Sequence, residues 1–235
     1  MKVFAISDPH LSFTADKPMS IFGDVWENHW DRIEADWRAK VTEEDIVLLA
    51  GDISWGMTLE EARKDLDAIG ALPGKKVYIR GNHDYWWNGI SKIRAALPAG
   101  SYCIQNDAMR FGSVVICGTR GWTVPEIGTS LSADDEKILK REALRMEMSL
   151  KCAEKLRTDG DMLIAMCHFP PFDSRYSPSV FTELFNRYSV DKVVYGHLHG
   201  SHSRAELYVN RGDIEYYLTS CDKLGNSLAL VADIG

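Results

Sequence analysis

The sequence lacks the long apolar runs and the cysteine patterns that mark several specialised classes of protein. Its first residues, MKVFAISDPH, turn polar too soon to form a signal peptide or a membrane span. The five cysteines are an odd number, are widely scattered and contain no CxxC pair. This pattern fits reduced core thiols better than a disulfide framework or a thiolate zinc site. We therefore expect a soluble, cytoplasmic protein that does not bind a membrane.

A run rich in lysine and arginine is also missing. The formal net charge is -7 and the sequence pI is about 5.5, so we expect no binding of long nucleic acid. The sequence shows no internal repeat, low-complexity tract or convincing linker. With 235 residues, of which 45% are hydrophobic, the chain can build one buried core. We expect one domain over residues 1–235, and the sequence leaves the oligomeric state open.

Short apolar runs alternate with helix-like stretches along most of the chain. Buried strands are expected at residues 3–7, 46–50, 76–80, 163–167 and 192–195. Helices are expected at residues 26–40, 59–69 and 89–97. In the first of these helices, Trp30, Ile33 and Trp37 share one face. The alternation predicts the α/β class.

The second half of the chain combines one long helix with antiparallel strands. Ser132 can cap a helix over residues 134–157, and its apolar stripe consists of Leu139, Ala143, Met146, Leu150 and Ala153. A hairpin turning at Gly112 is expected over residues 107–118, and an antiparallel meander over 203–209, 213–219 and 227–233. This mixture predicts two sheets with outer helices. The loop-like segment 120–132 is either functional or a surface connection.

Five polar clusters stand at or just after the apolar runs. They are Asp8-Pro-His10, Gly51-Asp52, Gly81-Asn82-His83-Asp84, His168-Phe-Pro-Pro and Gly196-His197-Leu-His199. Because ligand sites form at the carboxyl ends of strands in open α/β sheets, these clusters can share one site. Each cluster alone has an ordinary explanation, since Gly-Asp and Asn-His pairs are common in turns and caps. The combination indicates a site.

Five of the seven histidines fall in these clusters. His197 and His199 would point to the same side of an extended strand, which favours metal binding. His29 and His202 lie outside the clusters, and we assign them surface or packing roles. Mixed His, Asp and Asn ligation suits manganese, iron, zinc, nickel or cobalt, whereas calcium or magnesium would favour more oxygen ligands.

The ordered pattern D-x-H, G-D, G-N-H-D, H and G-H-x-H resembles that of the calcineurin-like metallophosphoesterase superfamily. The match runs from Asp8 to His199, which is most of the chain. The phrases SDPHLS, GDISWG, RGNHDYWW, HFPP and YGHLHG are similar to a little-characterised bacterial branch of predicted phosphohydrolases. The resemblance implies a four-layer α/β/β/α sandwich of two mixed sheets flanked by helices.

The resemblance also implies two divalent metal ions with a shared ligand. One ion would be held by the residues matching Asp8, His10, Asp52 and His199. The other would be held by those matching Asp52, Asn82, His168 and His197. Asp52 would then bridge the two ions.

Such a pair of ions suits the hydrolysis of phosphate esters. Two cations roughly 3.5–4 Å apart neutralise the anionic phosphorus centre and lower the pKa of a bridging water, so that a metal-bridging hydroxide can attack. His83 follows a ligand without being one in the family pattern, and we interpret it as the general acid for the leaving group. Asp84 has two possible roles: it either raises the pKa of His83 or stabilises the turn.

One block departs from the pattern of the protein Ser/Thr phosphatases in the superfamily. Those enzymes carry G-D-x-x-D-R-G, whereas this chain has GDISWG over residues 51–56. The difference argues against a phosphoprotein substrate and leaves open which residue orients His83.

Further residues are candidates for contacts with the substrate. Arg80, Arg120 and Arg175 are candidate phosphate ligands, because a guanidinium group matches phosphate oxygens in a bidentate geometry, although surface arginines are common. Three tryptophans either line a substrate pocket or belong to the core, namely Trp86, Trp87 and Trp122.

The expected function is therefore hydrolysis of a small phosphomonoester, phosphodiester or nucleotide anhydride. A non-catalytic metal-binding interaction module on the same fold is the alternative, but in such a module we would expect ligands to be lost, and here every ligand position is filled. A binuclear zinc β-lactamase type of hydrolase is a third possibility, and its H-x-H-x-D-H signature is missing from the sequence. The natural substrate and the native metals stay open.

Overall fold

Two mixed β-sheets form the centre of the protein in this computed structural model, which describes residues 1–200, 203 and 205–235. The first sheet has the strand order β11 (Ala229–Asp233), β1 (Lys2–Ile6), β2 (Ile46–Leu49), β3 (Lys75–Tyr78), β4 (Ser101–Cys103). The second has the order β5 (Ala108–Phe111), β6 (Val114–Thr119), β7 (Met162–Cys167), β8 (Lys192–Tyr195), β10 (Ile214–Leu218), β9 (Tyr208–Arg211). The pairs β1–β11, β5–β6 and β9–β10 are antiparallel, and the other pairs are parallel.

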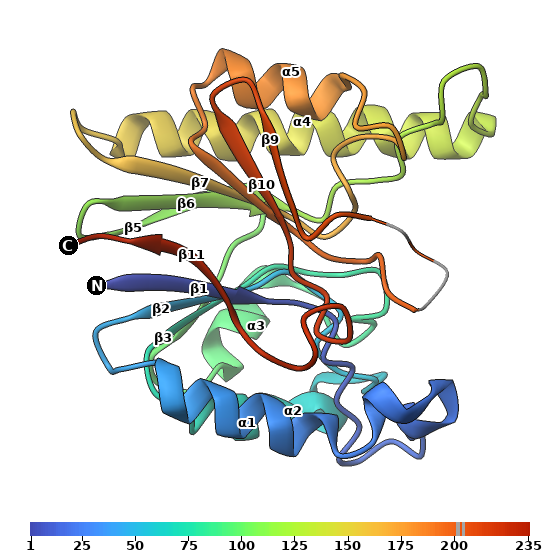
Figure 1. Ribbon diagram of the computed structural model, residues 1–235, viewed down its shortest axis with the longest axis vertical. Coiled ribbons are helices and arrows are strands. Elements are labelled where there is room, and N and C mark those ends of the chain that lie inside the picture. The colour runs from blue at the N-terminus through green and yellow to red at the C-terminus, as the bar shows by residue number, and fades with distance from the viewer. Residues whose placement is uncertain (201–202, 204) are drawn as a thin grey trace.

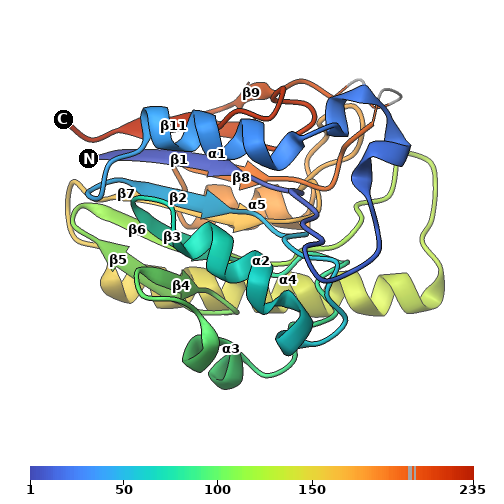
Figure 2. The same cartoon turned by 90° about the horizontal axis from the view of Figure 1, so that it is seen from below.

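Helices cover the outer face of each sheet (Figure 1). The first sheet is covered by α1 (His29–Lys40), α2 (Leu59–Gly70) and α3 (Ile90–Ala96), which Figure 2 shows lying across it. The second sheet is covered by α4 (Ala133–Leu156) and α5 (Val180–Arg187). Two short 3-10 helices, η1 (Met19–Phe22) and η2 (Asp24–Trp26), precede α1. The predicted four-layer sandwich is confirmed.

Alternating side chains of the strands join the layers. In β1, Phe4 and Ile6 pack toward the helices of their own side, whereas Val3 and Ala5 pack between the sheets. The middle layer also contains Ile164 and other apolar residues of the second sheet. Because both faces of these strands are buried, their sequences are continuous apolar runs rather than alternating patterns. This explains why the strands were recognisable in the sequence.

Some element boundaries differ from the prediction. The predicted helix over residues 26–40 begins only at His29, because Trp26 belongs to η2. The predicted long helix is confirmed as α4, and the side chain of Ser132 accepts the N–H of Asp135 at 3.1 Å as its cap. The short elements β4 and α5 were not predicted, since three or eight residues carry little periodic signal.

The predicted C-terminal meander is only partly correct. β9 and β10 form a hairpin that turns at Gly212, but β11 pairs with β1 in the first sheet. β11 joins the first sheet because β1 offers a free edge for pairing. In this position Val231 and Ala232 of β11 are buried between the two sheets. The predicted strand over 203–209 begins at Tyr208, and residues 201, 202 and 204 lie outside the described part of the chain.

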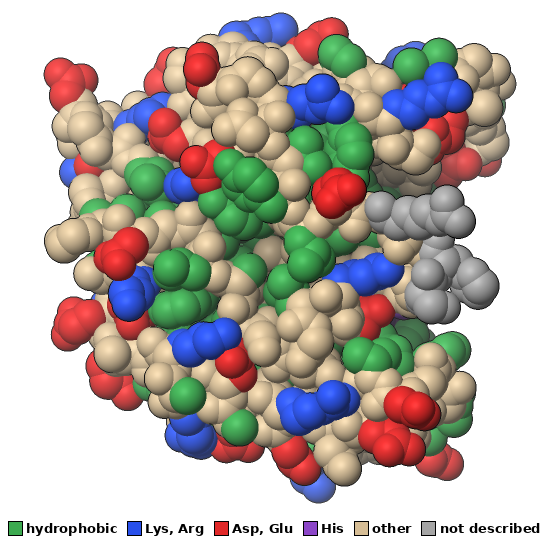
Figure 3. Space-filling view, in the orientation of Figure 1, with side chains coloured by type: hydrophobic (Ala, Val, Ile, Leu, Met, Phe, Trp, Pro, Cys, Tyr) green, Lys and Arg blue, Asp and Glu red, His purple; other side chains and the backbone are tan. Residues whose placement is uncertain are grey.

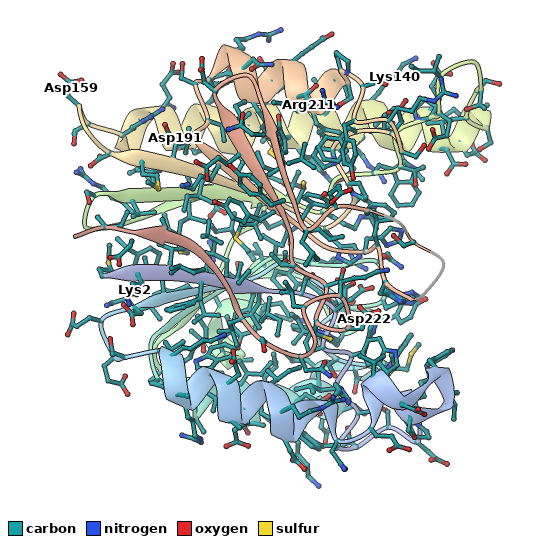
Figure 4. The ribbon with its side chains drawn as sticks, viewed as in Figure 1. Lys2, Lys140, Asp159, Asp191, Arg211 and Asp222 are labelled. Atoms are coloured by element: carbon teal, nitrogen blue, oxygen red, sulfur yellow. The ribbon has the colours of Figure 1, made fainter. Side chains whose placement is uncertain are left out.

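The carboxyl ends of the parallel strands all lie at one end of the sandwich. In Figure 4, Lys2 marks the opposite end, where β1 begins, and Asp222 marks the end to which the parallel strands run. The predicted polar clusters follow these strands and therefore meet at that end. Among the described residues, no helix has both the length and the apolar character needed to cross a bilayer.

Candidate metal centre

All seven predicted metal ligands lie in loops at the carboxyl ends of five neighbouring strands. Asp8 and His10 follow β1, Asp52 follows β2, Asn82 follows β3, His168 follows β7, and His197 and His199 follow β8. The loops come from both sheets, so the site spans the sandwich. The structure brings these residues together although 191 positions separate the first from the last, from 8 to 199.

The carboxylate of Asp52 lies between histidines of the two sheets. Its Oδ2 atom is 3.4 Å from His168 Nε2 and 3.7 Å from His10 Nε2. Its Oδ1 atom accepts the backbone N–H of His83 at 2.7 Å, whereas Oδ2 has no hydrogen-bond partner among the described residues. A buried carboxylate oxygen without a donor is costly unless a cation compensates it. This position suits a bridging ligand.

Asn82 and two histidines form one half of the centre. The side-chain oxygen of Asn82 lies 2.7 Å from His168 Nε2 and 3.0 Å from His197 Nδ1. His168 Nδ1 is 2.9 Å from the carbonyl oxygen of Ala50, to which it can donate. With Nδ1 donating there, the short contact between Nε2 and the Asn82 oxygen requires either a proton on Nε2 or a cation that both atoms bind.

The electrostatics of His168 show that this position attracts positive charge. Burial opposes protonation of its ring, but the nearby carboxylate of Asp52, followed by that of Asp8, raises the pKa of His168 to about 9. The same two carboxylates would stabilise a divalent cation bound to the His168 ring in place of the proton.

Asp8, His10 and His199 form the other half. One donor atom from each lies within 4.8 Å of the other two, and a second such group consists of Asp8, Asp52 and His168. Both ring nitrogens of His10 are buried without a hydrogen-bond partner in the described chain. Burial lowers the pKa of His10 to about 3, so its ring is neutral and able to bind a metal. Asp8 belongs to both groups, so its carboxylate lies near the ligands of both halves, as that of Asp52 does.

Neighbouring donors hold Asp8 in place. Its Oδ2 atom accepts the hydroxyl groups of Ser7 at 2.6 Å and Ser220 at 2.9 Å, and the backbone N–H of His197 at 3.0 Å. These contacts fix the carboxylate, whose Oδ1 atom accepts, among the described residues, only the shared N–H of His197, at 3.2 Å. Ser7 and Ser220 were not predicted, because nothing in the sequence distinguishes a serine that orients a ligand.

Four of the predicted ligands have left-handed backbone conformations. Asp8, His10, Asp52 and His197 have φ angles of 56°, 45°, 54° and 70°. Residues other than glycine seldom adopt such angles, and each costs of order 1–3 kcal/mol. Strain of this kind gathers where a site must aim its side chains.

Two glycines of the motifs are required because a side chain would not fit at their positions. A Cβ atom at Gly81 would lie 2.1 Å from Asp52 Oδ1, and one at Gly196 would lie 2.5 Å from Asp8 Oδ2. The loops of neighbouring strands therefore approach each other more closely than any side chain would permit.

Asp84 organises the loops instead of acting on His83. Its two oxygens accept the backbone N–H groups of Asp52, Ile53, Ser54 and Gly81 and the indole N–H of Trp86, at 2.8–3.3 Å. Burial raises the pKa of Asp84 to about 6, and the backbone donors oppose this increase. No hydrogen bond joins it to His83 in the described chain, so the turn-stabilising alternative is the one that the structure supports.

His83 packs against an aromatic residue that the sequence did not single out. Its ring centroid is 4.8 Å from that of Trp55, and Trp55 also stacks on His10 at 4.7 Å with an interplanar angle of 19°. Trp55 therefore positions His83 beside a predicted ligand. It lies only three residues after Asp52 in the sequence, but the contact itself is tertiary.

The remaining candidates separate into different environments. Arg80 and Arg120 line one cavity of about 240 Å³, whereas Arg175 is exposed and does not line it. Trp86 and Trp87 are fully buried in the first core cluster, so of the two alternatives the structure supports the core role for both. Trp122 is partly buried beneath the guanidinium of Arg120, 4.7 Å from its ring centroid.

His29 has the packing role expected for it. Its ring nitrogens lie 3.0 Å from the carbonyl oxygen of Trp26 and 2.8 Å from that of Pro9, which ties the start of α1 to the first metal loop. His202, the other histidine outside the clusters, lies outside the described residues. The cysteines form no disulfide, and four of the five are buried.

A second cavity lies directly beside the predicted ligands. It has a volume of about 530 Å³, and His197 forms part of its wall. Phe169, Phe172, Tyr176 and Leu198 form an apolar part of the wall, and the acidic residues that also line the cavity are Glu126, Asp173 and Glu206. A group of small-molecule size therefore fits next to the metal centre.

The model of the calcineurin-like phosphoesterase family matches residues 1–201 of this sequence. The chain belongs to this family. An uncharacterized protein of Methanocaldococcus jannaschii is 29% identical over 119 residues, which are 45% of this chain and 64% of that protein. The match thus spans somewhat less than two thirds of that relative.

A similar fold is found in solved structures of proteins from Thermus thermophilus and Aquifex aeolicus. A protein of Thermus thermophilus has a TM-score of 0.61 at 10% identity, with 97% of this chain and 96% of that chain covered. A protein of unknown function from Aquifex aeolicus has a TM-score of 0.51 at 14% identity, with 97% and 95% covered. At these identities the likeness shows the shared fold.

Proposed function

We propose that the protein is a dinuclear metal-dependent hydrolase of small phosphomonoesters or phosphodiesters. The observation that carries the proposal is the buried Asp52 Oδ2 atom, which has no hydrogen-bond partner among the described residues and lies between His10 and His168, and so between the two halves of the centre. Membership of the family supports phosphoester chemistry. The described ligands fit manganese, iron, zinc, nickel or cobalt, because nitrogen and oxygen donors are mixed.

Two divalent cations bound there would supply Lewis acidity toward the phosphoryl oxygens and a nucleophile from water at neutral pH. The residues of the chain orient the reaction. Asp52 would hold both ions, Asn82 would add a neutral oxygen, and His83 would deliver a proton to the leaving group. Trp55 would keep the ring of His83 beside the centre, as the contact at 4.8 Å supports.

The second cavity supports a small organic leaving group. Its apolar wall adjoins His197, so an ester with an aromatic or other apolar group would bury that group next to the metal centre. On the face shown in Figure 3, acidic and basic side chains are interspersed without a broad area of one sign. This arrangement supports a small substrate rather than a long nucleic acid.

Hydrolysis of bis-p-nitrophenyl phosphate and p-nitrophenyl phosphate by manganese-loaded protein tests the proposal. We expect turnover that EDTA abolishes and that Asp52→Asn reduces by at least about 100-fold, because the bridge between the ions is weakened. Asp161→Asn is the matched control, since Asp161 is a buried aspartate at the start of β7, away from the metal loops. Absence of turnover with every divalent ion would favour the non-catalytic metal-binding module.

A further inference from the structure

The cavity of about 240 Å³ contains an unusual number of arginines. It lies beside α4 at the ends of β3 and β6, and its wall includes Arg80, Asn106, Arg120, Arg141, Glu142 and Arg145. Among its lining residues, all of them described, none is a predicted metal ligand. The cavity is therefore a separate feature beside the metal centre.

Most of the positive charge in this cavity is not neutralised by the chain. Four arginines and one glutamate give a net charge of +3, as 4 − 1. Glu142 is buried, and its carboxylate accepts Arg145 at 2.6 Å and the hydroxyl of Thr119 at 3.1 Å, with Arg120 at 3.7 Å. Glu142 therefore contacts Arg145 and Arg120 only, whereas Arg80, which is half-buried, and Arg141, which is exposed, have no carboxylate partner among the described residues.

The arrangement is costly without a further anion. The Nε atom of Arg80 is buried and lacks a hydrogen-bond partner in the described chain. The guanidinium of Arg120 lines the same cavity as those of Arg80, Arg141 and Arg145, and its ion-pair contact with Glu142 is long, at 3.7 Å. A buried donor without an acceptor destabilises a fold, and so do like charges that line one cavity. A bound anion would remove both costs.

We infer that this cavity binds a phosphate-class oxyanion through the guanidinium groups of Arg80, Arg120 and Arg141. Guanidinium groups match tetrahedral oxyanions because two N–H donors can reach two oxygens at once. The volume lies below the roughly 300–1,000 Å³ of most small-molecule pockets, so the bound group is a small anion rather than a whole nucleotide.

Two sources can supply this anion. One is free inorganic phosphate. The other is a second phosphate group of the substrate, a possibility that rests on the proposed function. Arg80 lies two residues before Asn82, and the carbonyl oxygen of Arg120 accepts the backbone N–H of His168 at 2.9 Å. The cavity therefore borders the metal loops, within reach of a substrate that carries two phosphate groups.

Calorimetric titration with inorganic phosphate tests binding without any turnover. The full-length protein is titrated as purified and again after EDTA treatment, which separates this site from the metal centre. We expect one equivalent of phosphate to bind after EDTA treatment. Arg141→Gln and Arg80→Gln should each weaken this binding at least about tenfold, as expected for a lost charge-assisted hydrogen bond.

Lys140→Gln is the matched control. Lys140 neighbours Arg141 on α4, is labelled in Figure 4 and does not line the cavity, so its loss removes the same charge outside the site. We expect its phosphate affinity to stay within about twofold of the unmodified protein, because Lys140 does not line the cavity and an exposed charge outside a site contributes little. Absence of phosphate binding after EDTA treatment, or equal weakening by Lys140→Gln and Arg141→Gln, would overturn the inference.

Turnover then distinguishes the two sources. If the anion is part of the substrate, esters with a second phosphate group should have a lower KM than those with one, and Arg141→Gln should remove the difference. If it is free phosphate, KM should not depend on a second group. Because binding is measured without catalysis, failure of the proposed function would leave the binding result intact.

Discussion

Replacement of Asp84 by asparagine tests how the metal loops are held together. Asp84 Oδ2 accepts the N–H groups of Asp52 at 2.9 Å and Gly81 at 2.8 Å, and Oδ1 accepts three further donors. An asparagine amide places an NH₂ group where one of these oxygens was. At least two buried donors then lose a charged acceptor, whichever way the amide is oriented.

Hydrogen bonds to charged groups contribute about 1.5–3 kcal/mol each, so the loss of two predicts a destabilisation of about 3–6 kcal/mol. This is a large part of the roughly 5–15 kcal/mol that stabilises most domains. Urea unfolding in EDTA measures it without the contribution of bound metal. Manganese affinity should fall as well, because the loops of Asp52 and Asn82 share this anchor.

Asp161→Asn is again the control. Asp161 accepts the N–H and the hydroxyl of Thr158 at 2.8 and 2.9 Å, far from the metal loops. Its replacement should reduce stability and leave manganese affinity within about twofold, because no predicted ligand is attached to that loop. An Asp84→Asn protein that unfolds within about 1 kcal/mol of the original, or binds manganese equally well, would refute this role for Asp84.

Three further predictions concern catalysis, packing and pH. His83→Ala should reduce turnover of esters with poor leaving groups much more than that of nitrophenyl esters, and equal losses would rule out its acid role. Gly81→Ala should abolish metal binding measured by calorimetry, because the new Cβ would lie 2.1 Å from Asp52 Oδ1; unchanged binding would contradict this geometry. Although burial opposes the change, hydrogen bonds from Lys2 and Thr42 lower the pKa of Asp45. The stability that the Asp45 carboxylate contributes is therefore complete above its ordinary pKa and is lost as pH falls through the lowered pKa. Urea unfolding at about pH 5 and about pH 3 measures this contribution. Between these two pH values Asp45→Asn should lose less stability than the original protein does, and an equal loss in both proteins would exclude the contribution.

The predictable parts of the structure are those that local sequence patterns determine. Strands such as β1 and β7 are buried on both faces, so each appears as an uninterrupted apolar run followed by a polar cluster. Parallel strands place their carboxyl ends together, which is why Asp8, Asp52 and His168 could be assigned to one site. α4 was predicted because its apolar stripe runs over many turns.

Other features depend on tertiary contacts that local patterns do not encode. The pairing of β11 with the first sheet depends on the free edge of β1 and is not encoded in the residues of β11 alone. Trp86 and Trp87 stand next to a motif, but the turn at Asp84 directs them into the core. Arg141 and Arg145 lie on one side of α4 with Arg80 opposite, a grouping that only the fold creates.

A manganese titration of EDTA-treated protein, with bis-p-nitrophenyl phosphate turnover recorded at each addition, tests the two-metal centre most directly. We predict two bound equivalents per chain and activity that becomes complete only as the second is filled, because both halves of the site share Asp52. In Asp52→Asn, binding of both equivalents should weaken together. Full activity at one equivalent, or none at two, would contradict a dinuclear phosphoesterase.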